Sequence, residues 1–210
     1  MDKEEFASRI DHTLLDKDAP LKEFDLLAEE AEELGTNVCV PPCHVDRVSG
    51  VTGEVIAVVG FPHGTSTTEA KRQEAAAVIE LGATEIDVAA NVSYLKSGKK
   101  DLFRKDIAEV TDLGVTTKSI IETGLLSDEE KRLAARLSVE AGADYVKTCT
   151  GYSKGRATVE DVSLIKNVVG ERAKIKASGG IGSAKEAIKL LEAGAHRIGA
   201  SSGASLVREY

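Results

Sequence analysis

Two lysines lie inside short aliphatic runs of the kind that form strands. Lys147 follows Tyr145-Val146, and Lys176 lies in the run Lys174-Ile175-Lys176-Ala177. Side chains alternate along a strand, and adjacent strands lie about 4.8 Å apart, so two lysines facing the same interior could meet. A nearby cation and removal from water favour the neutral amine, which can attack a carbonyl and form an imine. A single lysine is ordinarily a solvated surface residue, but this pair predicts Schiff-base chemistry.

Two aspartates occupy similar positions. Asp87 lies in Glu85-Ile86-Asp87-Val88, and Asp11 lies in Ile10-Asp11-His12-Thr13. A carboxylate that faces a buried interior needs a partner, and a lysine or a catalytic water would serve. A structural ion pair is the alternative for Asp87, and a capping aspartate is the alternative for Asp11.

Two loops of small residues follow late aliphatic runs. They are Ser178-Gly179-Gly180 and Gly199-Ala200-Ser201-Ser202-Gly203. Glycine lets backbone N–H groups approach an anion closely, serine adds hydroxyl donors, and the loops after strands seven and eight often bind phosphate in (β/α)8 barrels. Tight turns into helices are the alternative interpretation.

The elements that position these residues repeat along the chain. Helix-like stretches end at Gly35, Gly82, Gly114, Gly142 and Gly194, and each is followed by a short apolar run. Glycine after a helix adopts the left-handed cap conformation at little cost. The sequence predicts strands at 8–13, 37–40, 55–60, 84–90, 117–122, 144–149, 174–178 and 196–200. Alternating helices and parallel strands predict one α/β domain over residues 1–210, a (β/α)8 TIM barrel, rather than an open doubly wound sheet.

Helix starts and core composition add two expectations. Ser66, Ser127 and Ser183 each precede a glutamate by three residues, which predicts three capping boxes. The chain has only eight aromatic residues, four Tyr and four Phe. We therefore expect aliphatic side chains to fill the layers inside the barrel.

Composition excludes several classes of protein. The net charge of −8 disfavours a nucleic-acid partner. No apolar run is long enough to span a membrane, and the charged N-terminal stretch lacks a signal-peptide pattern. Three cysteines indicate a reducing cytoplasm. Cys39 and Cys43-His44 have no partner cluster for a metal, and no nucleotide-binding glycine motif occurs, so neither a metal nor a cofactor is expected.

Eight stretches, taken in order, resemble the 2-deoxyribose-5-phosphate aldolase family along nearly the whole chain. They are Ile10-Asp11-His12-Thr13-Leu14-Leu15, Val38-Cys39-Val40-Pro41, Val59-Gly60-Phe61-Pro62, Glu85-Ile86-Asp87-Val88, Ile120-Ile121-Glu122-Thr123, Val146-Lys147-Thr148-Cys149-Thr150-Gly151, Lys176-Ala177-Ser178-Gly179-Gly180 and Arg197-Ile198-Gly199-Ala200-Ser201-Ser202. The resemblance implies a metal-free class I aldolase on a TIM barrel. Such an enzyme reversibly cleaves 2-deoxyribose 5-phosphate to glyceraldehyde 3-phosphate and acetaldehyde.

The resemblance also implies roles for individual residues. Lys147 would form the Schiff base. Lys176 would favour the neutral form of Lys147 and help proton transfer. Asp87 would exchange protons through a water, and Asp11 would support the two lysines. The phosphate would be held by Gly151, Gly179, Gly180, Gly199, Ser201 and Ser202. A homodimer or homotetramer is also implied.

The chain departs from the family pattern at several positions. Cys149 replaces a serine that is common in the family, Tyr152 stands where some relatives carry a basic residue, and Gly182 stands where many carry arginine. We therefore expect weaker phosphate affinity, and so a weaker preference for the phosphorylated sugar, than in relatives that carry those cations. The catalytic tyrosine in the tail of some relatives is not assigned to Tyr210. Another phosphosugar aldolase and a phosphosugar-binding regulator without an imine lysine are the competing hypotheses.

Overall fold

The computed structural model describes residues 1–210 and contains eight strands that close into a barrel. The strands are β1 (Ile10–Thr13), β2 (Asn37–Val40), β3 (Val55–Val59), β4 (Glu85–Ala89), β5 (Thr116–Ile120), β6 (Tyr145–Lys147), β7 (Lys174–Ser178) and β8 (Arg197–Ala200). All eight lie within the ranges expected from the sequence except β5, which begins one residue earlier. The fold class predicted from the sequence, a (β/α)8 barrel, is confirmed.

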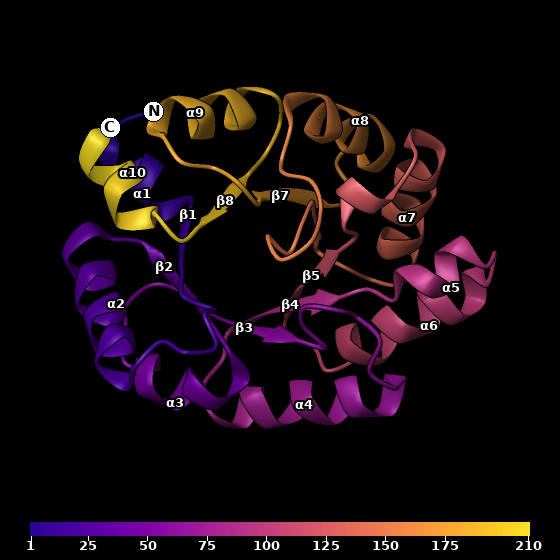
Figure 1. Ribbon diagram of the computed structural model, residues 1–210, viewed down its shortest axis with the longest axis horizontal. Helices are drawn as coiled ribbons and strands as arrows, with labels where there is room; N and C mark the ends of the chain where they lie inside the picture. The colour runs from indigo at the N-terminus through magenta and orange to yellow at the C-terminus, as the bar shows by residue number, and fades with distance from the viewer.

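Helices surround this barrel (Figure 1). They are α1 (Lys3–Ser8), α2 (Leu21–Leu34), α3 (Val45–Val48), α4 (Thr68–Glu80), α5 (Val92–Lys96), α6 (Lys100–Thr111), α7 (Asp128–Glu140), α8 (Val159–Val169), α9 (Ala184–Glu192) and α10 (Gly203–Glu209), with the short 3₁₀ turns η1 (Pro42–His44) and η2 (Thr123–Leu125). No helix combines the length and the apolar character needed to cross a bilayer.

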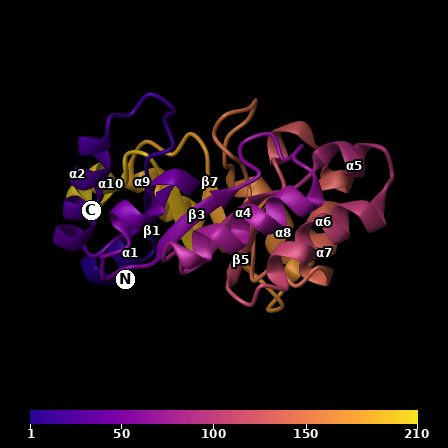
Figure 2. The same ribbon diagram turned by 90° about the horizontal axis from the view of Figure 1, so that it is seen from below.

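Every strand pairs in parallel with its neighbours in the sequence, and β8 returns to pair with β1. The register places Asp87 opposite Lys118 and Lys147 opposite Lys176. The two ends of the chain lie near each other at one side of the molecule (Figure 2), where the Tyr210 hydroxyl donates to the Met1 carbonyl at 2.5 Å. The parallel register brings the carboxyl ends of all eight strands to one mouth of the barrel.

Helix termini follow the expected chemistry with two corrections. At Ser183 only half of the predicted box forms, because the Ser183 hydroxyl accepts from the Glu186 N–H while the Glu186 carboxylate accepts from the Gly182 N–H. Gly35 ends α2 with φ of 72°, the left-handed conformation that glycine adopts without steric cost. Ser127 forms a complete capping box with Glu130 at the start of α7. The box predicted at Ser66 is wrong, because Thr67 is the residue whose side chain caps α4 and accepts from the Ala70 N–H.

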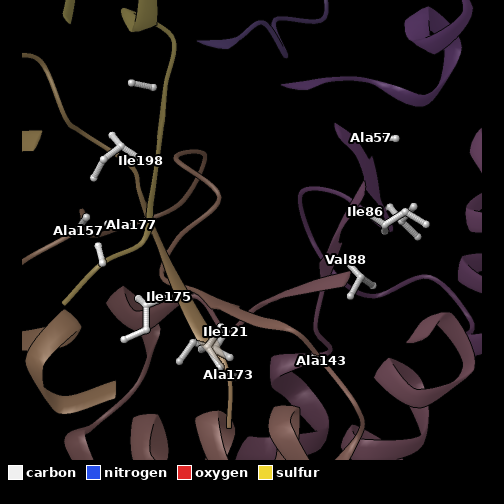
Figure 3. Close-up of a cluster of buried hydrophobic side chains, with 14 of the residues drawn as sticks. Ala57, Ile86, Val88, Ile121, Ala143, Ala157, Ala173, Ile175, Ala177 and Ile198 are labelled. Atoms are coloured by element: carbon white, nitrogen blue, oxygen red, sulfur yellow. The ribbon is translucent and has the colours of Figure 1, made fainter. Parts of the chain in front are cut away.

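The aliphatic core lies between the barrel and its helices. Figure 3 shows part of it, including Ile86, Val88, Ile175 and Ile198. The expectation of aliphatic layers throughout the barrel interior is only partly right. A separate small apolar cluster of Cys39, Ile56 and Val58 comes from β2 and β3. The other strands, β1 and β4 to β8, place charged side chains in the interior, and these residues build the candidate site.

Candidate active site

A cavity of about 610 Å³ opens where the strands end. The loops after β1, β6, β7 and β8 form most of its wall. The wall includes all six small residues predicted to bind phosphate, which are Gly151, Gly179, Gly180, Gly199, Ser201 and Ser202. Lys147 and Asp16 are the only charged residues that line it. The cavity therefore brings the predicted imine lysine and the predicted anion loops onto one surface.

Side-chain hydrogen bonds join the loops that carry this wall. The Thr148 hydroxyl donates to the Ser178 carbonyl at 2.9 Å, and the Ser178 hydroxyl donates to the Cys149 carbonyl at 2.6 Å. The Thr150 hydroxyl donates to the Glu122 carboxylate at 2.6 Å. Buried polar groups satisfied in this way hold a loop in one arrangement. The ends of β6 and β7 are thus fixed relative to each other.

Two glycines show why the wall needs small residues. Gly180 has φ of 70°, where side chains are rarely tolerated. A Cβ on Gly199 would lie 2.9 Å from the Lys176 Cε atom. A side chain at position 199 would therefore displace the lysine beneath the cavity floor.

Lys147 and Lys176 meet at one carboxylate oxygen. Each Nζ lies 2.7 Å from Oδ2 of Asp87. Asp87 and Lys176 are fully buried, whereas the Lys147 side chain keeps 3% of its surface exposed at the cavity. Burial alone would raise the pKa of Asp87, but the ammonium groups of Lys118, Lys147 and Lys176 outweigh burial and hold it well below its ordinary value.

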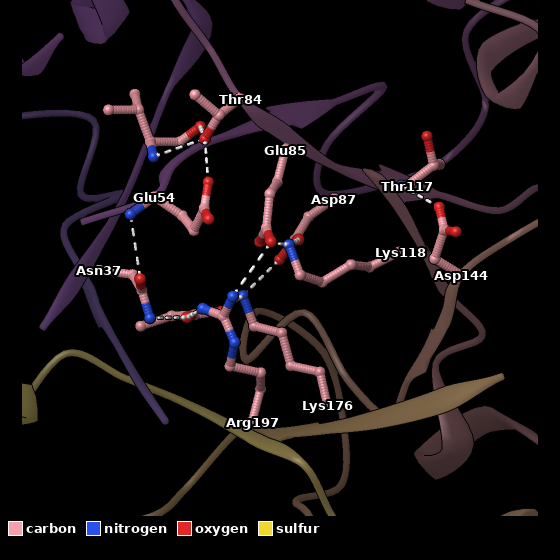
Figure 4. Close-up of polar contacts among 12 residues, drawn as sticks. Asn37, Glu54, Thr84, Glu85, Asp87, Thr117, Lys118, Asp144, Lys176 and Arg197 are labelled. Carbon is pink, nitrogen blue, oxygen red and sulfur yellow. Dashed lines mark hydrogen bonds and ion pairs between the residues drawn. The ribbon is translucent and has the colours of Figure 1, made fainter. Parts of the chain in front are cut away.

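Behind Lys147, six side chains of alternating charge form a closed ring of ion pairs across the barrel interior. Five are buried, Arg197 keeps 12% of its side chain exposed, and all but Asp11 are labelled in Figure 4. In order around the ring they are Arg197, Asp11, Lys176, Asp87, Lys118 and Glu85, and Glu85 returns to Arg197. We call this set the charge ring. Its N···O distances lie between 2.5 and 3.1 Å. Since the residues come from five different strands, β1, β4, β5, β7 and β8, only barrel closure can assemble it.

The charge ring is balanced, with three cations and three carboxylates, and Lys147 is a surplus cation attached to it at Asp87. Burial would lower the pKa of Lys176, but Asp11 and Asp87 raise it above the ordinary lysine value. Burial would likewise raise the pKa of Asp11, but Lys176 and Arg197 hold it down. The ring members therefore stabilise one another in their charged forms.

Three ring members were not singled out from the sequence. Glu85, Lys118 and Arg197 lie at the buried faces of β4, β5 and β8, with side-chain exposures of 7%, 0% and 12%. A signal for Glu85 existed, because it precedes Asp87 by two residues and must share its face of the strand. Lys118 and Arg197 offered no comparable signal, since charged residues near the start of a strand are usually solvated.

Five other polar residues do not line the cavity: His12, Cys39, Cys43, His196 and Tyr210. His12 pairs with Glu30 at 3.0 Å, and His196 Nδ1 accepts from the Ile175 N–H at 3.1 Å. Cys39 is buried in the barrel while Cys43 is exposed. Tyr210 stacks on Phe6 with ring centroids 4.4 Å apart.

Comparison with known proteins matches this arrangement to a family. The sequence pattern of the DeoC/LacD family of aldolases matches residues 6–210. The chain belongs to the DeoC/LacD aldolase family. The enzyme class expected from the sequence, a lyase, is thereby confirmed.

Individual members of the family resemble this chain over nearly its full length. The deoxyribose-phosphate aldolase of Caldanaerobacter subterraneus subsp. tengcongensis is 48% identical across 97% of this chain and 93% of its own, and that of Brevibacillus brevis is 49% identical across 94% and 93%. The tetrameric deoxyribose phosphate aldolase from Aeropyrum pernix superposes with a TM-score of 0.92 at 32% identity, covering 99% of this chain and 91% of its own.

Proposed function

We propose that this DeoC/LacD family member reversibly cleaves 2-deoxy-D-ribose 5-phosphate to D-glyceraldehyde 3-phosphate and acetaldehyde, through a Schiff base on Lys147. The observation that carries the proposal is the surplus cation. Losing one proton from Lys147 leaves equal numbers of cations and carboxylates in the barrel, and among the four cations only Lys147 lines the 610 Å³ cavity. The named relatives support the choice of substrate.

The neutral Lys147 amine attacks the C1 aldehyde of the open-chain sugar, and loss of water gives the protonated imine. The imine nitrogen draws electrons from the adjacent carbon framework. Removal of the C3 hydroxyl proton then breaks the C2–C3 bond, releases glyceraldehyde 3-phosphate and leaves an enamine on Lys147. Protonation at C2 and hydrolysis by water release acetaldehyde. The lysine itself supplies the electron sink, so the proposed reaction uses no metal or organic cofactor.

Asp87 and Lys176 would manage the protons of this sequence. Asp87 is held as a carboxylate 2.7 Å from the Lys147 Nζ, so it can accept and return a proton through a water at that amine. Lys176 is held as an ammonium on the same oxygen and can donate there. Asp11 would hold Lys176 in place from the other side, at 2.6 Å.

The phosphate would bind at the six small residues of the cavity wall. Gly151, Gly179, Gly180 and Gly199 would present backbone N–H groups, and Ser201 and Ser202 would add hydroxyls. Tyr152, at a position where relatives carry a basic residue, directs its hydroxyl to Asp16 at 3.3 Å. Because neutral donors bind a dianion less strongly than cations do, we expect phosphate to improve the Michaelis constant moderately.

Trapping the imine tests the proposal. The protein is incubated with acetaldehyde or the sugar phosphate, reduced with borohydride and mapped by mass spectrometry. We expect an adduct on Lys147 that disappears in Lys147→Ala and diminishes in Lys176→Leu. Folded protein without an adduct would contradict imine chemistry, and an adduct mainly on Lys176 would reverse the assignment. Cleavage assays on a panel of phosphorylated aldoses and ketoses decide the substrate.

Assembly and compartment complete the proposal. We propose a homodimer or homotetramer, in line with the tetrameric relative from Aeropyrum pernix. The cytoplasm is proposed because all three cysteines are free thiols in the structure. Light scattering after size exclusion would measure the assembly, and a monomer at micromolar concentration would contradict it.

A further inference from the structure

The charge ring reaches the opposite end of the barrel from the substrate cavity. Glu85 and Arg197 line a second cavity of about 410 Å³, whose wall comes from the strand starts and the segments that precede them. This cavity shares no lining residue with the first. The two residues are therefore too remote to touch a substrate bound at Lys147.

Two unbroken routes nevertheless join this end to Lys147. In one, Arg197 binds Asp11 at 2.6 Å, and Asp11 binds Lys176 at 2.6 Å, which shares Asp87 with Lys147. In the other, Glu85 lies 2.5 Å from Lys118, whose Nζ lies 3.1 Å from Asp87. Both routes end on the carboxylate that contacts the Lys147 amine.

We propose that Arg197 and Glu85 are positioning residues of opposite sign that set how readily Lys147 exists as the neutral amine. This inference rests on the imine chemistry proposed above. Arg197 opposes a positive charge on Lys147 and Glu85 supports it, and together they leave the ring neutral. Neither residue contacts the substrate, so their effect is electrostatic, and it is transmitted through largely buried groups whose charges water and salt screen less than surface charges.

Several other charged or titratable groups lie near Arg197 without belonging to the ring. Lys147 contacts Asp87 of β4, where Lys118 of β5 and Lys176 of β7 also converge, and the Cys39 thiol of β2 lies close enough for its charge to interact with that of Lys147. The groups that surround Arg197 are Asp11, Glu85, Tyr145, Glu54, Asp144, Glu171, Arg172 and Lys174. Only Asp11 and Glu85 of this set form ion pairs with Arg197.

Removing one ring charge should therefore shift the pH at which the imine forms. A unit charge about 10 Å away, at an effective dielectric constant of about 20, displaces a protonation equilibrium by about one pH unit. Glu85→Gln leaves the ring with a net positive charge, so the pH of half-maximal imine formation should fall by about one unit. Arg197→Gln leaves the ring with a net negative charge, so the same pH midpoint should rise by about one unit. The double variant restores neutrality and returns close to the original protein.

The experiment measures the rate of reductive trapping of acetaldehyde on Lys147 by cyanoborohydride across pH, with circular dichroism to verify folding. Arg197→Lys keeps the charge and should keep the original midpoint. Glu171→Gln is the matched control, because Glu171 lines the same cavity but pairs with Lys166 outside the ring. Its midpoint should not move.

Each outcome decides one of the two proposals. Opposite shifts in the two single variants, cancelling in the double variant, support the inference. Shifts in the same direction, or midpoints unchanged in folded variants, overturn it and leave a merely structural role. If Arg197→Gln does not fold, the comparison of Glu85→Gln with the double variant decides in the same way. Absence of any adduct in the unmodified protein overturns the imine proposal instead.

Discussion

Two groups of buried lysines in this protein have opposite consequences. Lys71 of α4 pairs with Asp106 of α6 at 2.5 Å, and both side chains are completely buried. Lys71 also donates to the Ala89 carbonyl, and Thr68 donates to Asp106. The charge ring is nearly as buried, with no side chain more than 12% exposed, but it carries one additional lysine that reaches a cavity.

The comparison separates a structural ion pair from a chemically competent one. At Lys71 each charge has its own partner and every neighbour is protein, so the pair fixes α4 to α6 and to the end of β4. Burial lowers the pKa of Lys71, although Asp106 opposes this. At the ring, one cation exceeds the carboxylates, and among the four cations only that one lines the 610 Å³ cavity. Surplus charge and access, rather than burial, mark the candidate catalytic lysine.

The largest expected effect is the loss of cleavage activity when Lys147 is replaced. Lys147→Ala should lower cleavage of deoxyribose 5-phosphate by about 10⁴-fold or more, because no other lysine reaches the cavity to form the imine. The same change removes the surplus cation and leaves the ring balanced, so the free energy of unfolding should not fall by more than about 1 kcal/mol. Urea denaturation and initial rates measure both. Substantial remaining turnover would contradict the assignment of the surplus lysine at the cavity as the candidate catalytic residue.

Asp87→Asn should reduce both the free energy of unfolding and the cleavage rate. The change removes the carboxylate that contacts three lysines, which costs about 3–5 kcal/mol when a buried pair loses one partner. Loss of the proton carrier should lower the rate by about 10²–10⁴-fold in protein that remains folded. A variant with normal stability would show that the ring is not held together at Asp87.

Lys71→Met should affect stability alone. It leaves Asp106 buried without its cation, so we expect a loss of about 3–5 kcal/mol in the free energy of unfolding. The double variant Lys71→Met with Asp106→Leu should recover most of this loss, because an apolar pair of similar volume avoids the unpaired charge. Activity per folded molecule should stay unchanged in both. A reduced rate in the stable double variant would show that this pair also serves the reaction.

The smallest effect should appear only in acid. The pKa values of Asp11 and Asp87 are lower in the folded protein than in the unfolded chain. Their contribution to stability is therefore complete above the unfolded value of about 3.9 and is lost as pH falls through the folded values. Unfolding free energies measured between about pH 3 and pH 7 should show a slope below about pH 4 that is reduced in Asp11→Asn. An equal slope in that variant would assign acid sensitivity elsewhere.

The sequence predicted the barrel well for local physical reasons. Helices that end at glycine and short apolar runs are encoded within single segments, so the strand positions could be read to within a few residues. The same local pattern placed Lys176 on the face opposite Ile175, and the structure shows Ile175 in the outer core and Lys176 inside. The error at Ser66 was also local, since Thr67 competes for the same cap.

The chemistry of the candidate site depended partly on recognisable residues and partly on closure of the barrel. Lys147, Lys176 and Asp87 could be proposed from the sequence because aliphatic neighbours predict burial, and buried charges need partners. The pairing of Arg197 with Asp11 could not, because 186 positions separate them along the chain. Nor could the Lys71–Asp106 pair, since both residues lie on helices whose charged side chains ordinarily face water.

The sequence by itself therefore determined the repeating unit, the strand faces and the residue types able to form an imine. Only the tertiary structure decided which charges meet, because parallel strands from across the chain place their side chains in one interior. Closure made the ring neutral and left Lys147 as its surplus cation at the cavity. Electrostatic balance is a property of the assembled barrel, since each pairwise energy depends on a distance that no single segment specifies.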